Sequence, residues 1–260
     1  MLISARLQAP QIPSPKNAKL SMNLILLFEE DFIGDQRVRL CARRREHVQN
    51  VHRAELGDQL TVGLLNGAIG TGEVVLNKSD TLELKVDLQQ PPPPALPLTL
   101  LLALPRPKML KRVLQTVTAM GVKKLVLLNS YRVEKSYWQT PILQTENLRQ
   151  HLVLGLEQAK DTQLPEVILR KRFKPFVEDE LLALVGNSRA LVAHPNTSNA
   201  CPRDINSAAT LAIGPEGGFI QYEIEKLTEV GFEAVHLGPR ILRVENAVPA
   251  ILGRLFYLMY

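Results

Sequence analysis

Cysteine is scarce in this sequence, and long apolar runs are missing. The two cysteines, Cys41 and Cys201, lie far apart and form no Cys-x-x-Cys pair, which excludes a disulfide framework and argues against a zinc site. The five histidines are not at metal-ligand spacing, so we expect no bound metal. The longest apolar stretch, residues 98–104, is much shorter than the roughly 18 residues of a membrane span. These features predict a cytoplasmic protein with reduced thiols and no membrane association.

Acidic residues are absent from residues 1–21, which contain three basic residues and three prolines. This segment has neither a clear amphipathic repeat nor the apolar core of a signal peptide, although a transit peptide has a similar composition. We expect a disordered extension over residues 1–21, with Met22 opening the folded part.

Basic residues outnumber acidic ones by 31 to 26, a net charge of +5. Such an excess is a mild electrostatic preference for polyanions, and each basic cluster taken alone also fits a solvated surface. The clusters lie at residues 37–53, 106–112 and 170–174, and their recurrence favours nucleic acid as a partner.

Four consecutive prolines, Pro91 to Pro94, divide the chain, because such a run adopts polyproline II and forms a stiff spacer. Before it, residues 59–64 and 81–86 alternate with period two and predict strands of a small β-barrel, with one short helix near residues 44–51. Gly67, Gly70 and Gly72 lie between short strands, so a hairpin with a bulge is preferred over a nucleotide loop. We expect domains at residues 22–88 and 98–260, joined by a linker at 89–97.

The part after the prolines alternates strands and helices, which predicts an α/β domain with a parallel sheet covered on both faces. The run at 98–104 has the continuous apolar character of a strand buried on both faces. Pro107 then suits the first position of a helix, and Gly121 suits its end. Further strands are expected at 124–128, 190–193, 210–213 and 234–237, and further helices at about 146–160, 176–185, 221–230 and 247–258.

Three predicted strands end in unusual sequences, and ligands of open α/β sheets bind at such carboxyl ends. These sequences are His194-Pro195, Gly214-Pro215-Glu216-Gly217-Gly218 and Gly238-Pro239-Arg240-Ile241-Leu242-Arg243. Glycine lets the backbone approach a ligand closely, and the free backbone groups can hydrogen-bond an adenine edge and a ribose. No Lys-Ser/Thr follows the second sequence, so it is not a P-loop. Glu216 would repel a phosphate and tolerate a sulfonium, which favours S-adenosylmethionine over ATP.

The sequence 213–219, Glu223, and the sequence 237–243 with Glu245 and Ala247 together resemble the paired signature of the RsmE family. Members of this family are 16S ribosomal RNA uridine-N3 methyltransferases of the SPOUT trefoil-knot class. Weaker likeness covers residues 47–58, Glu157-Gln158 and Leu164-Pro165, and the resemblance extends from about Met22 to the C-terminus.

The resemblance implies a PUA-like barrel that docks RNA, a C-terminal domain with a deep knot, and a homodimer. It also implies that the loops of the knot hold S-adenosylmethionine, mostly through backbone contacts. The expected cofactor-binding residues are Ala193, His194, Ile213, Gly214, Pro215, Glu216, Gly218, Leu237, Gly238, Ile241 and Leu242.

For the chemistry, Arg243 is the candidate cation that stabilises the uridine anion once N3 has lost its proton. Glu216 or a water is expected to accept that proton, and Arg240 to shape the pocket. The alternative for both arginines is a structural salt bridge with Glu245 or Glu216. His194 is a less favoured candidate for the general base.

The predicted RNA contacts are Arg43, Arg44 and Arg53 on the barrel, with Arg132 in the second domain. Trp138 lies near Tyr131 and Arg132 in the sequence, and core or dimer packing is favoured for it over base stacking.

The sequence departs from the family pattern at three places. Residues 23–27 lack the usual arginine, Asn246 replaces a threonine, and Asp161 stands where the family has an arginine. We expect Asn246 to replace the threonine both as a hydrogen-bonding group and as a helix N-cap. The departures leave two alternatives open: an inactive RNA-binding or ribosome-assembly factor, and a methyltransferase for another RNA position.

Overall fold

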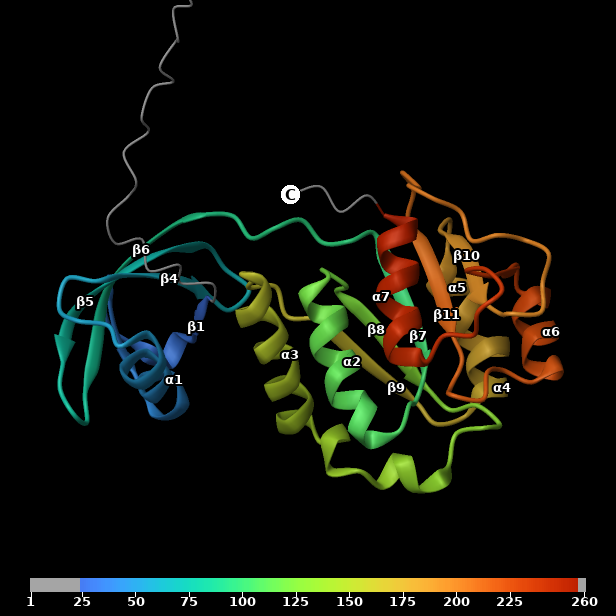
Figure 1. The fold of residues 1–260 in the computed structure, drawn as a ribbon, viewed down its shortest axis with the longest axis horizontal. Helices are drawn as coiled ribbons and strands as arrows, with labels where there is room; N and C mark the ends of the chain where they lie inside the picture. Colours follow the sequence, from blue (N-terminus) through green and yellow to red (C-terminus); the bar gives the residue numbers. More distant parts are fainter. Residues whose placement is uncertain (1–23, 257–260) are drawn as a thin grey trace, which may run out of the picture.

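A computed structural model describes residues 24–256 of the chain, in two six-stranded sheets with helices packed mainly around the second (Figure 1). The expected extension at 1–21, the expected start at Met22 and the last two residues of the helix expected at 247–258 lie outside the described residues. No helix within residues 24–256 combines the length and apolarity that crossing a membrane requires.

The first sheet is mixed: its order is β1-β4-β5-β6-β3-β2, with β1 parallel to β4 and the other neighbours antiparallel. Its strands are β1 (Ile25–Leu27), β2 (Phe32–Gly34), β3 (Arg37–Leu40), β4 (Gln59–Leu64), β5 (Ile69–Asn77) and β6 (Leu82–Gln90). The helical turns are η1 (Glu29–Asp31), α1 (Ala42–His47) and η2 (Val48–His52). The predicted strands and short helix are therefore confirmed.

Buried and more exposed residues alternate along much of β4 and β6, so one face of this sheet is buried. Leu60 and Val62 of β4 pack with Leu84 and Val86 of β6 in one apolar cluster. The glycines form the predicted hairpin: the Gly67 N–H bonds the Leu64 carbonyl at 2.8 Å, and the register shifts at Ile69/Gly70. A Cβ on Gly70 would lie 1.8 Å from the carbonyl oxygen of Asp87, so only glycine fits this bulge.

The second sheet is parallel throughout, in the order β12-β10-β11-β7-β8-β9. Its strands are β7 (Leu98–Ala103), β8 (Lys124–Leu128), β9 (Glu166–Arg170), β10 (Arg189–Ala193), β11 (Ala209–Ile213) and β12 (Glu233–Val235). The predicted α/β class is confirmed. The prediction missed β9, an edge strand whose charged ends and half-buried centre produce no continuous apolar run.

Helices α2 (Pro107–Ala119), α3 (Thr145–Ala159) and α7 (Val244–Leu255) group together, with α2 packed against both of the others (Figure 1). The remaining helical segments are η3 (Lys135–Gln139), η4 (Pro141–Leu143), α4 (Phe173–Pro175), η5 (Phe176–Glu180), α5 (Leu181–Val185) and α6 (Gln221–Glu229). The helix predicted at 176–185 is thus part of a longer helical segment that starts at Phe173.

Direct contacts join the first sheet to α3 and to the loop after it, besides residues 91–97 that connect β6 to β7. Leu24 and Leu26 pack with Val153 and Leu156 of α3, and the Leu24 N–H donates to the Glu157 carbonyl at 2.9 Å. The loop after α3 bonds the hairpin turn, since the Asn66 N–H donates to the Thr162 carbonyl at 2.8 Å.

The same loop explains how the chain accommodates Asp161. Its carboxylate is buried and pairs with Lys123, whose ammonium group also donates to the Gln163 carbonyl at 2.7 Å. An acid at this position therefore holds the loop that contacts the first sheet.

Candidate functional site

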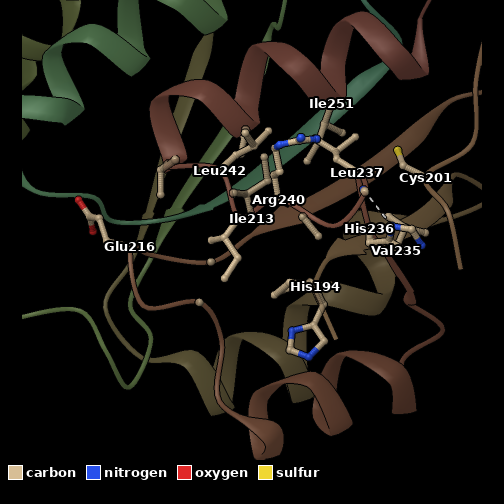
Figure 2. Close-up of a pocket in the computed structure, with 18 of the residues that line it drawn as sticks. His194, Cys201, Ile213, Glu216, Val235, His236, Leu237, Arg240, Leu242 and Ile251 are labelled. Carbon is tan, nitrogen blue, oxygen red and sulfur yellow. Dashed lines mark hydrogen bonds between the residues drawn. The ribbon is translucent and has the colours of Figure 1, made fainter. Parts of the chain in front are cut away.

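A pocket of about 250 Å³ opens at the carboxyl ends of β10, β11 and β12, where the sequence predicted it (Figure 2). All the residues predicted to bind the cofactor line this pocket, and so does Arg240. Its lining also includes Cys201 and Ile251, from the loop after β10 and from α7, which the prediction did not include.

The loop after β11 requires glycine for two different reasons. At Gly214 a Cβ would lie 2.8 Å from the backbone nitrogen of Phe219, because the loop folds back on its own start. Gly218 has a φ of 73°, and its N–H closes the turn on the Pro215 carbonyl at 2.7 Å. The Gly-Pro sequence therefore makes a compact turn that presents backbone to the pocket.

The loop after β12 is closed by a side chain. The Gly238 N–H donates to Nδ1 of His236 at 2.9 Å, drawn as a dashed line in Figure 2. Gly238 has a φ of 121°, which favours glycine. At both Gly218 and Gly238 a Cβ would meet no atom within 4 Å, so the backbone here faces open space.

His194 closes the third side of the pocket. Its N–H donates to the Val235 carbonyl at 2.9 Å, continuing the pairing of β10 with β12. Burial lowers the pKa of the His194 imidazole below its ordinary value, so the ring is neutral at physiological pH.

Glu216 points away from the other labelled side chains of the pocket (Figure 2). Its Oε1 accepts the backbone N–H of Arg106 at 3.0 Å, at the N-cap of α2. A carboxylate in this place satisfies a donor at the start of the helix and interacts favourably with its dipole. Glu216 thus ties the loop after β11 to α2.

Arg240 and Arg243 are exposed, and within residues 24–256 neither forms an ion pair. The salt bridges considered for them, with Glu245 or Glu216, are not present in this structure. Arg243 is the N-cap of α7 and lies between two residues of the pocket lining, Leu242 and Val244. Two expectations are wrong here: α7 begins at Val244 rather than near 247, and Asn246 lies inside the first turn rather than at the N-cap.

Arg132 lies beside the pocket, where its guanidinium donates to the carbonyl of Gly217. The loop that carries it is anchored by Glu223 of α6, whose side chain is buried. One carboxylate oxygen accepts the Tyr131 N–H at 2.7 Å and the other accepts the Ile220 N–H at 3.0 Å. Burial is the main cause that raises the pKa of Glu223, and the two backbone hydrogen bonds oppose it. The sequence identifies Glu223 only as part of the signature that resembles the RsmE family.

The three arginines predicted to contact RNA on the first sheet differ in their surroundings. Arg44 is largely buried in an ion pair with Asp31 and lies over the Phe28 ring, which assigns it to packing. Arg43 is half exposed and pairs with Glu157 at 2.8 Å. Arg53 is exposed at the end of η2 with a φ of 51°.

No group of three or more His, Cys, Asp or Glu side chains among residues 24–256 is arranged to hold a metal ion.

The molecule is thus an α/β protein whose parallel sheet carries a glycine-lined ligand pocket at its carboxyl edge. Residues 92–256 match the model of the RNA methyltransferase domain, and the chain belongs to that family. The resemblance inferred from the sequence is confirmed.

Curated relatives cover most of the chain. Ribosomal RNA small subunit methyltransferase E of Treponema pallidum is 29% identical, over 88% of this chain and 88% of its own. Ribosomal RNA small subunit methyltransferase E 1 of Borreliella burgdorferi is 24% identical, over 88% of this chain and 95% of its own.

Solved structures share the fold. The small subunit methyltransferase E of Neisseria gonorrhoeae, bound to S-adenosyl methionine, has a TM-score of 0.70 at 21% identity, covering 89% of this chain and 95% of that one. The Legionella pneumophila methyltransferase Lpg2936, in complex with the same cofactor, has a TM-score of 0.68 at 24% identity, covering 88% and 95%.

Proposed function

We propose that this chain transfers a methyl group from S-adenosylmethionine to N3 of a uridine in small-subunit ribosomal RNA. The observation that carries the proposal is the pocket at the ends of β10, β11 and β12, in a chain of the RNA methyltransferase domain family. The names of the curated relatives support ribosomal RNA of the small subunit as the substrate, and such a substrate fits a cytoplasmic protein.

The residues present fit the cofactor. Gly218 and Gly238 leave their backbone open to a ligand, and the lining around them is mostly apolar, with Ile213, Leu237 and Leu242. Such a pocket suits an adenine and a thioether, with backbone groups supplying the hydrogen bonds. When bound, S-adenosylmethionine supplies the methyl group.

The chain's own residues position and stabilise the acceptor. The N3 of uridine is a poor nucleophile until its proton leaves, and a cation beside O2 or O4 stabilises the anion that results. Arg243 is exposed at the edge of the pocket and pairs with no carboxylate of residues 24–256, which suits this role, while Arg240 shapes the lining. Because Glu216 is bonded to the start of α2, we assign it to holding the loop and a water to accepting the proton.

The two parts of the chain have different roles in this proposal. Residues 22–88 form the PUA-like unit that docks RNA, with Arg43 and Arg53 as phosphate contacts, and residues 89–97 form the linker. Residues 98–260 carry the methyltransferase site, with Arg132 at its rim, and their last strands and α7 form the trefoil knot. Phosphate contacts from arginine make RNA binding salt-dependent.

A homodimer completes the proposal, because α7 presents an uncharged surface of small side chains. Ala250 and Gly253 are exposed on it, and a Cβ on Gly253 would meet no atom within 4 Å. Light scattering should give the mass of a dimer for the wild type and that of a monomer for Gly253→Arg. A wild-type monomer would refute the dimer.

Calorimetry with S-adenosylmethionine and mass mapping of small-subunit RNA, methylated by the purified protein, test the function together. Saturable binding with one new methyl group on a uridine is the expected result. Binding without methyl transfer would favour an inactive assembly factor, and methylation of another base or atom would change the acceptor.

A further inference from the structure

Tyr131, in the loop after β8, is unusually exposed for a large aromatic residue. Its relative exposure is 79%, whereas the neighbouring Val133 is buried and anchors the loop. Aromatic rings carry much apolar area and normally pack most of it away from water. A ring held in such an exposed position is available to contact a partner.

The position of Tyr131 is fixed by hydrogen bonds. Its backbone N–H donates to Oε1 of Glu223 at 2.7 Å, and Glu223 is only 2% exposed. The Val133 N–H donates to the Ser130 carbonyl at 3.0 Å and closes the turn that contains Tyr131. A surface whose backbone is ordered before binding loses less conformational entropy when a partner arrives.

The loop also adjoins the pocket. Arg132 donates to the Gly217 carbonyl, and a Cβ on Gly217 would lie 2.8 Å from Cδ of Arg132, so these two residues are in contact. Gly217 itself lines the pocket. Tyr131 therefore belongs to a loop that contacts the edge of the pocket through the next residue, a cation.

Trp138, the other aromatic residue considered for stacking, makes contacts inside the protein. Its indole packs against the core of the second sheet, and Nε1 donates to Oδ1 of Asn129 at 2.8 Å. Core packing is thus what the structure shows for Trp138.

We propose that the ring of Tyr131 stacks on an unpaired RNA base that neighbours the methylated nucleotide, while Arg132 faces the adjoining phosphate. This inference rests on the proposed function. A uridine N3 takes part in Watson–Crick pairing, so the target must be unpaired, and its neighbours lose stacking partners when it enters the pocket. Tyrosine replaces such a lost partner for any base, since every base has a π face.

The test measures binding of the full-length protein to a short labelled single-stranded RNA that contains uridine, and to the same strand within a duplex. Tyr131→Ala should weaken single-strand binding roughly tenfold and leave duplex binding unchanged. Tyr131→Phe and Tyr131→Trp should retain wild-type affinity, because both keep the ring. Leu182→Ala removes another exposed apolar side chain, on α5, and is the control.

Three further measurements separate the outcomes. The affinity for S-adenosylmethionine and the mass in solution should stay unchanged in Tyr131→Ala, while the KM for small ribosomal subunits rises. Equal single-strand affinity of Tyr131→Ala and wild type overturns the stacking role. Loss of the dimer in Tyr131→Ala also overturns it, because the ring would then pack against a second copy. If the wild type methylates no RNA, the proposed function fails, whatever Tyr131 does.

Discussion

The carboxylate of Glu216 accepts the backbone N–H of Arg106 at 3.0 Å, although 110 residues separate the two in the sequence. The bond joins the loop after β11, which lines the pocket, to the start of α2. A carboxylate used in this way needs only an acceptor oxygen and no proton exchange. Glu216 is therefore distinguishable by experiment from a general base.

Glu216→Gln retains an acceptor oxygen, so we expect kcat within a few-fold of wild type and an unchanged pH profile. Glu216→Ala removes the acceptor and should weaken cofactor affinity about tenfold, the scale of one charge-assisted hydrogen bond. Steady-state kinetics across pH and calorimetry measure both effects. A general base would instead show a loss of about 10²- to 10⁴-fold in kcat for Glu216→Gln.

Arg243 should act on turnover rather than on cofactor binding, because it lies just outside the pocket lining with no carboxylate partner in the described chain. We expect Arg243→Ala to lower kcat by about 10²- to 10³-fold, as for removal of one donor to an oxyanion. The affinity for S-adenosylmethionine should change by no more than a few-fold. Arg172→Ala, at an exposed site before α4, is the control, and a fully active Arg243→Ala enzyme would disprove the assignment.

The sequence predicts the pocket well because its determinants are local. Gly214 directly follows the buried strand β11, Gly218 lies in the same loop, and Gly238 lies in the loop after β12. The strand ends of one parallel sheet meet at one edge. The contacts that hold these loops could not be predicted, because each joins distant segments: Glu216 to Arg106, and Glu223 to Tyr131.

Two further features could not be predicted from the sequence for similar reasons. Arg44 belongs to a basic cluster in the sequence, and only the fold brings it to the buried Asp31. The predicted start of α7 is wrong because the N-cap residue, Arg243, makes no capping side-chain hydrogen bond. The sequence therefore contains no N-cap signal at this position.

Lys160 ends α3 in the left-handed conformation, with a φ of 54°. Glycine adopts this conformation without the steric cost of a Cβ, so Lys160→Gly should raise the free energy of unfolding by about 1 kcal/mol. Lys160→Ala keeps the Cβ and should give no such gain, which makes it the matched control. Urea unfolding monitored by circular dichroism measures both variants, and equal stability of the two would contradict a backbone origin.

Glu223 predicts a pH dependence of stability. Burial raises its pKa in the folded protein above the value in the unfolded chain, so the folded state binds the proton more tightly. Its contribution is therefore most favourable below the unfolded-state pKa and declines as pH rises through the folded-state pKa. Glu223→Gln removes the titrating group, so the stability of wild type relative to this variant should fall from pH 4 toward neutrality and then level off. Urea titrations at several pH values measure the difference, with Glu225→Gln, an exposed neighbour on α6, as the control. A difference that grows with pH would mean that the two backbone hydrogen bonds outweigh burial.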